Sequence, residues 1–333
     1  MSAADPVLRI DQLSVGFDLR DGGRLTAVDG VTLELGRGEL LALVGESGSG
    51  KSSLAMSLVG LNRGPGTNID GRVEFDGTDL LSASDKQLRA IRGRDIAVVF
   101  QDALAALNPL QRVGTQVSEM LRQHARLSRA DAWRRSEQLL ADVGIARPER
   151  NARAYPHQFS GGMRQRVMTA IALANNPAIL IADEPTTALD VTIQRQILLL
   201  LRRLQDEQGT AILLITHDLG VVADVADRVA VMYGGRIVEQ GTRDQVLYSP
   251  QHPYTMGLLN SMPRMSGPAR SRLPVIPGSP LAGAPSSGGC AFAPRCAFTH
   301  AACDTAPELA GHTGQPGHLD ACWLPVHERE ARS

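Results

Sequence analysis

The sequence predicts an α/β fold with a parallel core sheet, an antiparallel β subdomain, a helical subdomain and a small loop-rich C-terminal module. Three features lead to this prediction. Short apolar runs alternate with helical segments, the first 80 residues alternate between apolar and polar, and the composition changes near position 250. Buried strands that alternate with helices are typical of a parallel sheet with crossover helices. Period-two alternation is typical of half-buried antiparallel strands.

The first 80 residues contain both kinds of strand. Leu13 and Val15 alternate with smaller or polar neighbours, as do Leu33 and Leu35. The continuous apolar run from Leu40 to Val44 interrupts this pattern. Such a run is typical of a strand that is buried on both faces.

Helices are predicted from about Leu104 to Ala174, with breaks at Pro109, Pro148 and Pro156. Two further apolar runs, Ile179 to Ala182 and Ala211 to Ile215, read as buried strands. Between these strands a helix from Ile193 to Glu207 is expected. Its predicted apolar face consists of Ile197, Leu200, Leu201 and Leu204.

Charge and hydropathy restrict the function and the location. The formal net charge is -1, so no basic field favours nucleic acid as a partner. No apolar stretch approaches the roughly 20 residues of a membrane-spanning helix. The segment from Met1 to Asp11 lacks the features of a secretory signal. We therefore expect a protein of the cytoplasm that reaches a membrane only by docking on other chains.

The segment from Gly45 to Ser52 matches the phosphate-loop pattern G-x-x-x-x-G-K-[ST]. Glycines let successive backbone N–H groups point at phosphate, and the helix that follows offers its positive N-terminus. Lys51 supplies a charge for the β- and γ-phosphates, and Ser52 supplies a hydroxyl for Mg²⁺. The predicted nucleotide contacts are Gly45, Ser47, Gly48, Ser49, Gly50, Lys51, Ser52 and Ser53.

Two acids end the apolar strand that begins at Ile179. Asp183 suits the Mg²⁺ shell. Glu184 lies one residue further on, so its side chain points elsewhere and is predicted to polarise the attacking water. His217 follows the next buried strand and is a candidate for contacting the γ-phosphate, because ligands bind at the carboxyl ends of parallel strands.

A second anion site is predicted at the start of a helix after Phe159. Ser160 is a natural N-cap, and Gly161 and Gly162 allow close approach of an anion to the helix N-terminus. The residues alone also fit an ordinary capped helix. The helix itself is expected to run from Met163 to Ala174, with Met163, Val167, Ile171 and Ala174 on one face.

These motifs, in this order, resemble the ATP-binding domains of ABC transporters, which are P-loop NTPases. The segment Ser160-Gly161-Gly162 resembles the signature loop of that superfamily. Further resemblances assign roles to single residues. Gln101 resembles the Q-loop glutamine, which also reaches Mg²⁺ with Ser52 and Asp183. Asp190 resembles the D-loop aspartate, His217 the switch histidine, and Phe17 the aromatic residue that stacks on adenine.

The resemblance implies a mechanism and a set of partners. Two ATP-binding subunits pair head to tail, and each ATP lies between the phosphate loop of one subunit and the signature loop of the other. Closure buries ATP and hydrolysis releases it. The expected partners are a second ATP-binding subunit, which is an identical chain or a paralogue, two transmembrane permease subunits, and indirectly a substrate-binding protein. The expected location is peripheral, on the cytoplasmic face of the inner membrane.

The C-terminal part reads as a separate module, with a nucleotide-binding domain over residues 1–250 and an extension over 251–333. The segments His252-Pro253-Tyr254, Ile276 to Pro280 and Pro294-Arg295-Cys296 resemble the C-terminal extension of oligopeptide, dipeptide and nickel importer ATPases. The resemblance implies an ATPase that powers a bacterial importer of di- and oligopeptides.

The only four cysteines of the chain lie in this extension, at Cys290, Cys296, Cys303 and Cys322. Four thiolates on a loop-rich scaffold can hold a [4Fe–4S] cluster or close around Zn²⁺. Importers that resemble this chain are thought to carry a cluster, which makes iron–sulfur the preferred interpretation. Zinc and unliganded cysteines remain as alternatives.

Two other functions fit parts of the pattern. A soluble ABC ATPase acting on the ribosome or on DNA is the main alternative, although the chain has one ATPase domain and no basic surplus. A P-loop kinase would need neither the signature loop nor Glu184 at a strand end.

Overall fold

The structure is a computed structural model of the chain, and it describes residues 5–186, 191–262, 275–279, 288–312, 314–325 and 328–329. The described residues form two compact units, each built from segments that are distant in sequence. The first unit lies within Met1–Arg9, Glu34–Leu40 and Glu74–Ile215. The second unit lies within Ile10–Leu33, Leu41–Val73 and Thr216–Ser333.

The first unit is built on three parallel strands that lie side by side in the order β6, β7, β8. Every residue of β7 and β8 is buried, which confirms the two apolar runs predicted as buried strands. In chain order the unit contains β5 (Thr78–Asp79), α2 (Asp85–Ile91), β6 (Ile96–Val99), α3 (Ala103–Ala106), α4 (Val113–His124), α5 (Arg129–Asp142), α6 (Pro148–Asn151), the 3-10 helix η1 (Pro156–Gln158), α7 (Gly161–Ala172), β7 (Ile179–Asp183), α8 (Val191–Gln208) and β8 (Ala211–Thr216).

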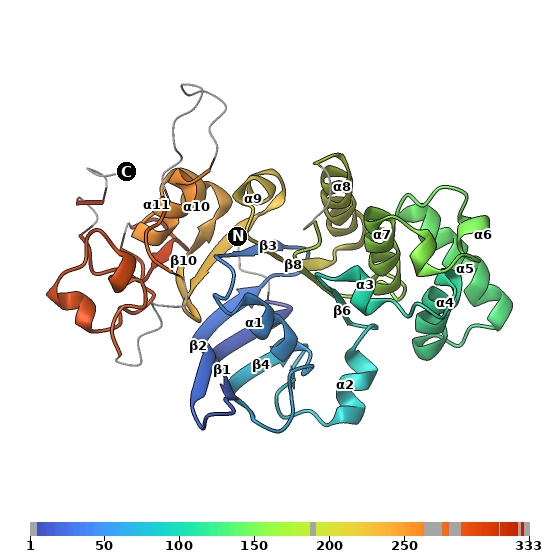
Figure 1. The fold of residues 1–333 in the computed structure, drawn as a ribbon, viewed down its shortest axis with the longest axis horizontal. Helices are drawn as coiled ribbons and strands as arrows, with labels where there is room; N and C mark the ends of the chain where they lie inside the picture. Colours follow the sequence, from blue (N-terminus) through green and yellow to red (C-terminus); the bar gives the residue numbers. More distant parts are fainter. Residues whose placement is uncertain are drawn as a thin grey trace. The chain divides into compact units, whose positions relative to one another are not determined.

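Helices α4, α5 and α7 pack against one another and form the predicted helical part of this unit (Figure 1). All three predicted breaks are confirmed: Pro109 lies between α3 and α4, whereas Pro148 is the first residue of α6 and Pro156 the first of η1. Proline is tolerated there because the N–H of the first helical residue has no partner within the helix. Within the described ranges, no helix is long and apolar enough to cross a membrane.

Two predicted helix faces are partly wrong. On α8, Leu198 is buried and Leu200 is only half-buried, although Ile197, Leu201 and Leu204 are buried as expected. On α7, the buried side includes Val167, Met168 and Ala170, whereas Met163 and Ile171 are half-exposed. A one-stripe pattern fails for α7 because its neighbours cover more than one side of the helix.

The second unit contains a mixed sheet. Strand β3 runs parallel to β9, β9 pairs antiparallel with β10, and β10 pairs antiparallel with β11. In chain order the elements that lie wholly or mainly in this unit are β1 (Leu8–Asp18), β2 (Arg24–Leu35), β3 (Leu40–Val44), α1 (Lys51–Leu58), β4 (Thr67–Phe75), α9 (Leu219–Val225), β9 (Arg228–Tyr233), β10 (Arg236–Thr242), α10 (Arg243–Tyr248), α11 (Pro253–Asn260), the 3-10 helices η3 (Ala293–Arg295) and η4 (Ala301–Asp304), and β11 (Leu319–Asp320).

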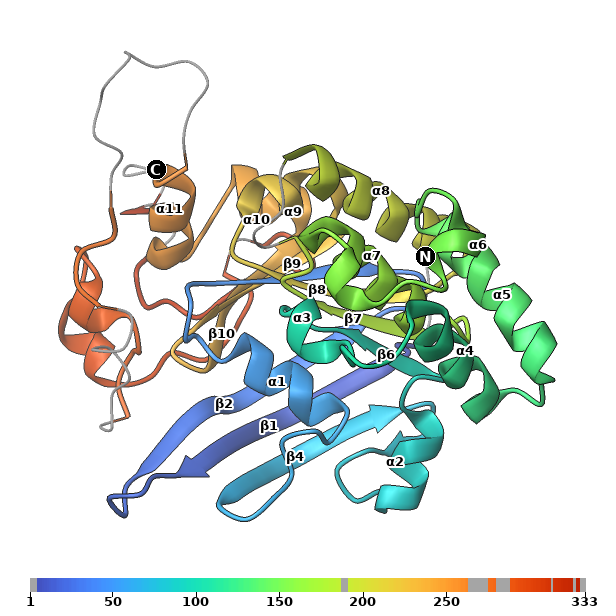
Figure 2. The ribbon, with the colours of Figure 1, turned by 45° about the vertical axis from the view of Figure 1, so that its right-hand side comes forward.

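The predicted contrast between the two kinds of strand is confirmed. Strands β2, β1 and β4 lie side by side in that order (Figure 2). In β1, Leu13 and Val15 are buried and flank the half-buried Ser14, and Leu8 and Ile10 are buried on either side of the exposed Arg9. All five residues of β3 are buried, as the continuous run from Leu40 to Val44 predicted.

The segment after residue 250 is tied to β10 by a buried carboxylate. Glu239 is 0% exposed and accepts hydrogen bonds from the backbone N–H groups of Gln251 at 2.7 Å and His252 at 2.9 Å. His318 Nε2 lies 2.9 Å from the same carboxylate. Glu239 on β10 therefore contacts two parts of the C-terminal extension, the segment Gln251–His252 and His318. The boundary at position 250 between two domains stays a prediction.

Candidate functional site

The phosphate loop connects β3 to α1, and two of its three glycines are required by the space around them. Gly50 has a φ of 105°, and a Cβ at this position would lie 2.1 Å from the carbonyl oxygen of Ala27. A Cβ at Gly45 would lie 2.2 Å from the carbonyl oxygen of Met232. Because no side chain fits at either position, the glycine spacing read from the sequence is a requirement of this fold.

Lys51 is held against the loop that it is predicted to serve. Its side chain is buried, and Nζ donates to the carbonyl oxygens of Gly45 and Glu46, both at 2.8 Å, and to Ser49 Oγ at 3.2 Å. A phosphate oxygen carries more negative charge than these neutral acceptors and would compete for the ammonium group. Ser52, the second residue of α1, is exposed, and its hydroxyl is the one expected to bind Mg²⁺.

In the first unit, the two acids at the end of β7 differ in backbone conformation and in contacts. Asp183 is 4% exposed and ends the strand. Glu184 has a φ of 48°, a left-handed conformation that is unfavourable for a residue with a side chain and that turns the chain sharply. Its carboxylate accepts a hydrogen bond from Gln101 Nε2 at 2.8 Å. Two predicted catalytic residues, 83 positions apart, are therefore in direct contact.

The signature segment forms the start of α7. Ser160 is the N-cap, and its Oγ accepts a hydrogen bond from the N–H of Met163 at 3.3 Å. Gly161 is exposed, and a Cβ added to it would meet no side chain within 4 Å, whereas a Cβ on Gly162 would lie 3.0 Å from Ile193 Cγ2. The N-terminus of this 12-residue helix is thus accessible at Gly161 and close to α8 at Gly162.

The remaining predicted nucleotide residues are distributed between the units. His217 follows β8, is exposed and belongs to the second unit, together with the phosphate loop. Phe17 is half-buried near the end of β1 in the same unit, and its stacking on adenine stays a prediction. Gln101, Asp183, Glu184 and the signature segment belong to the first unit. Asp190 lies outside the described residues.

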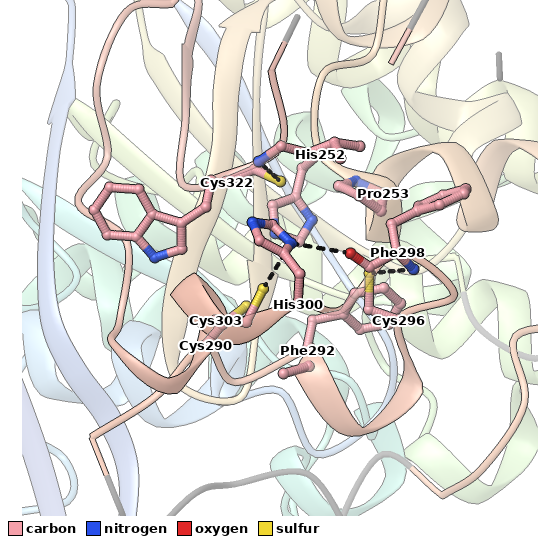
Figure 3. Close-up of a pocket in the computed structure, with 12 residues that line it drawn as sticks. His252, Pro253, Cys290, Phe292, Cys296, Phe298, His300, Cys303 and Cys322 are labelled. Atoms are coloured by element: carbon pink, nitrogen blue, oxygen red, sulfur yellow. Dashed lines mark hydrogen bonds between the residues drawn. The ribbon is translucent and has the colours of Figure 1, made fainter. Parts of the chain in front are cut away.

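The four cysteines come together in the second unit. All of them line one pocket of about 330 Å³, part of it open to solvent (Figure 3). Each cysteine is half-buried and none is in a disulfide. The other lining residues are mainly apolar, aromatic or histidine, namely His252, Pro253, Phe292, Ala293, Phe298, His300, Trp323 and Leu324.

The sulfur atoms have polar neighbours inside this pocket. The backbone N–H of Phe298 lies 3.4 Å from Cys296 Sγ, and that of Leu324 lies 3.4 Å from Cys322 Sγ. Cys303 Sγ lies 3.6 Å from His300 Nδ1, which enters the pocket beside it (Figure 3). Burial raises the pKa of the thiols of Cys290 and Cys296, and raises that of Cys322 to about 11. Without a cation in the pocket, these thiols favour the protonated form.

The pocket has some of the features of a site for a metal ion or an iron–sulfur cluster. Four thiols converge and backbone N–H groups point at two of the sulfurs, an arrangement that favours thiolates once a cation is bound. Among the described residues, however, no three His, Cys, Asp or Glu side chains are placed to hold one metal ion. A cluster of several irons is wider than one ion, so its ligands stand further apart than those of zinc.

Two residues of the extension contact the phosphate loop, a role that the sequence analysis did not assign. The Tyr254 hydroxyl accepts a hydrogen bond from the N–H of Glu46 at 2.8 Å, and the Arg295 guanidinium donates to the Glu46 carboxylate. Both residues stand in the motifs used for the family resemblance. The sequence carried no signal of the contact, because the partners are more than 200 positions apart.

Comparison with known proteins agrees with this combination of a phosphate loop, a signature segment and a cysteine-bearing extension. The family described as "ABC transporter" matches residues 28–187, and the family described as "Oligopeptide/dipeptide transporter, C-terminal region" matches residues 238–303. Among solved structures, a dimeric ATP-binding cassette in a post-hydrolysis state with ADP and Pi is 30% identical. Its TM-score is 0.65, over 71% of this chain and 98% of that chain.

Curated relatives match over most of the chain. The oligopeptide transport ATP-binding protein OppD of Bacillus subtilis is 50% identical over 88% of this chain and 82% of that protein. OppD of Escherichia coli is 46% identical over 98% of this chain and 95% of that protein. The dipeptide transport ATP-binding protein DppD of Bacillus subtilis is 48% identical over 98% and 97%.

The fold and the site thus define an ATP-hydrolysing subunit of the ABC transporter class. Within that class, the chain belongs to the family of oligopeptide and dipeptide transport ATP-binding proteins.

Proposed function

We propose that the chain binds and hydrolyses ATP with Mg²⁺ to power the uptake of di- and oligopeptides through a bacterial ABC importer. The observation that carries this proposal is the phosphate loop, with Lys51 buried against it, in the same chain as the importer-type extension over residues 238–303. A soluble ABC ATPase acting on the ribosome or DNA is not favoured, because the curated relatives are named as peptide transport proteins.

The roles of the site residues follow from their chemistry. The backbone N–H groups of the loop and Lys51 bind the phosphates, and Ser52, Gln101 and Asp183 hold Mg²⁺. Glu184 orients the attacking water, and its contact with Gln101 at 2.8 Å supports a shared task for the two residues. His217 contacts the γ-phosphate. Phe17 stacks on adenine.

A second subunit completes each nucleotide site in this proposal. Ser160, Gly161 and Gly162 of one subunit meet the γ-phosphate bound by the other, supported by the accessible helix start at Gly161. Asp190 contributes from its D-loop position. The pair, of identical chains or paralogues, docks on two permease subunits at the cytoplasmic face of the inner membrane. A substrate-binding protein delivers the peptide to the permeases.

Glu184→Gln tests the hydrolytic role. Steady-state ATP turnover should fall by about 100-fold or more, because the amide cannot accept a proton from water. Binding of ATP, measured by equilibrium titration, should stay within a few-fold of wild type. Glu207→Gln on the exposed face of α8 is the control and should leave both values unchanged. Full turnover in Glu184→Gln would contradict the assignment.

Transport is tested with the complete importer in vesicles. Labelled di- and tripeptides should enter only when ATP and wild-type subunit are present, and Glu184→Gln should abolish uptake. ATP hydrolysis by the assembled importer without ATP-dependent entry of any di- or oligopeptide would contradict the proposed substrate class.

For the cysteine pocket, we propose a [4Fe–4S] cluster held by Cys290, Cys296, Cys303 and Cys322, with Zn²⁺ as the alternative. The convergence of four thiols in one largely apolar pocket supports this proposal. A cluster there would hold together a segment with little regular secondary structure. The four cysteines would bind the group, and the apolar lining would reduce its contact with water.

Anaerobic purification followed by iron, sulfide and zinc analysis tests the cofactor. Wild type should contain about four irons per chain and absorb broadly in the visible range. Cys296→Ser should lose most of the iron, whereas Ser279→Ala, at an exposed position in the same extension, should keep it. Zinc in place of iron would contradict the cluster and support the alternative of a Zn²⁺ site. Absence of both metals would overturn the site.

A further inference from the structure

Arg295 connects the cysteine region to the phosphate loop through a forked ion pair. Its guanidinium donates from Nη1 to Glu46 Oε2 at 2.6 Å and from Nη2 to Glu46 Oε1 at 3.1 Å. The Arg295 side chain is 4% exposed and the Glu46 side chain 23%. Two parallel hydrogen bonds between charged groups fix both distance and orientation, which one bond cannot do.

The guanidinium is itself immobilised from several sides. Nε donates to the carbonyl oxygen of Pro277 at 2.8 Å, and Nη2 donates to that of Ile276 at 3.4 Å. Nη1 also donates to the Tyr233 hydroxyl at 3.3 Å, and the guanidinium carbon lies 5.6 Å from the Tyr233 ring centroid. Arg295 is therefore a fixed point against which Glu46 is held, rather than a mobile surface side chain.

Glu46 is the second residue of the phosphate loop, and its backbone takes part in the loop geometry. Its carbonyl oxygen accepts hydrogen bonds from Lys51 Nζ at 2.8 Å and from the N–H of Ser49 at 3.2 Å. Its own N–H donates to the hydroxyl of Tyr254, which is 0% exposed. The extension thus holds Glu46 at two places, the amide through Tyr254 and the carboxylate through Arg295.

The negative charge of Glu46 is unfavourable for a loop that binds phosphate. A carboxylate within a loop that receives a polyanionic ligand repels that ligand, and the repulsion is strong where solvent is partly excluded. The paired guanidinium offsets this charge. An unpaired Glu46 would both repel phosphate and be free to move the loop.

We propose that Arg295 is a positioning residue for ATP binding: it holds Glu46 and offsets its charge, so that the affinity of the phosphate loop depends on the C-terminal extension. This inference rests on the proposed function, in which the loop binds ATP.

The test is equilibrium titration of full-length protein with Mg²⁺ and a fluorescent ATP analogue. Arg295→Met should raise the Kd on the order of tenfold, because Glu46 then carries an uncompensated charge. The double variant Arg295→Met/Glu46→Gln should bind close to wild type, since neutralising Glu46 removes the repulsion. Arg295→Lys, which keeps the charge but not the fork, should show an intermediate Kd.

Arg329→Met is the matched control. Arg329 is a buried arginine of the same extension, 2.8 Å from Asp320, and the structure assigns it no contact with the loop among those described. Its replacement removes a buried ion pair of the extension but should leave the Kd for ATP within about twofold of wild type.

Three results would overturn the inference. The first is an unchanged Kd in Arg295→Met with a lowered unfolding midpoint, which would make the pair only an anchor. The second is a double variant that binds as weakly as Arg295→Met. The third is an equal loss in Arg329→Met. Should Arg295→Met fail to fold, Tyr254→Phe and Arg295→Lys provide the same readout, and wild-type affinity in both would overturn the inference. Wild type that binds no ATP would overturn the proposed function itself.

Discussion

The phosphate loop and the cysteine pocket belong to the same compact unit, yet different interactions hold them in place. The loop follows a strand that is buried along its whole length, and its glycines fit against neighbouring backbone. The cysteine region contains two short 3-10 helices and a two-residue strand. Its fixed points are polar contacts such as those of Glu239 and Arg295. The loop is thus built on a buried strand and backbone packing, to which polar contacts such as that of Arg295 are added. The cysteine region has little regular structure, and it is held by polar contacts together with the packing of Phe292 against Tyr233 and Tyr254.

The largest loss of ATP affinity is expected at Gly50, where neighbouring backbone leaves no room for a side chain. Gly50→Ala should weaken ATP binding on the order of 100-fold, because its Cβ would lie 2.1 Å from the Ala27 carbonyl oxygen at a φ of 105°. Strain and overpacking of this kind cost about 2–4 kcal/mol. Titration with an ATP analogue measures the loss.

Gly64→Ala is the control for this substitution. A Cβ at Gly64 meets no atom within 4 Å, so binding and stability should match wild type. Wild-type affinity for ATP in Gly50→Ala would show that backbone packing around Gly50 does not constrain the loop.

A smaller effect is expected at the polar fixed point of the extension. Glu239→Gln should lower the free energy of unfolding by about 1–3 kcal/mol, because the buried amide cannot accept both backbone hydrogen bonds that the carboxylate accepts. Chemical denaturation measures the loss, and limited proteolysis should show earlier cleavage after residue 250. ATP affinity should change less than in Gly50→Ala.

Glu207→Gln provides the matched control. Glu207 pairs with Arg203 on the exposed face of α8, with both side chains more than half exposed. Its replacement should change the free energy of unfolding by less than about 1 kcal/mol. Equal stability losses in Glu239→Gln and Glu207→Gln would mean that the buried carboxylate does not anchor the extension.

The sequence predicted the parts of the fold whose pattern is local. Leu40 to Val44 was recognisable as a buried strand because every residue is apolar, and the glycine spacing after it fixed the phosphate loop. The predicted faces of α7 and α8 were less accurate. On α8, Leu198 rather than Leu200 is buried, and on α7 Met163 and Ile171 are only half-buried. Which side of a helix is covered depends on neighbours that the pattern of one helix does not contain.

The sequence by itself determined the order of the motifs, the buried strands, the capping of α7 by Ser160 and the clustering of the cysteines near the C-terminus, because spacing and residue type carry this information. Only the tertiary structure placed Gln101 on Glu184, gathered the four cysteines in one pocket and set Arg295 on Glu46. These contacts join residues far apart in the chain. Their geometry depends on how strands and loops pack, and no local pattern encodes it.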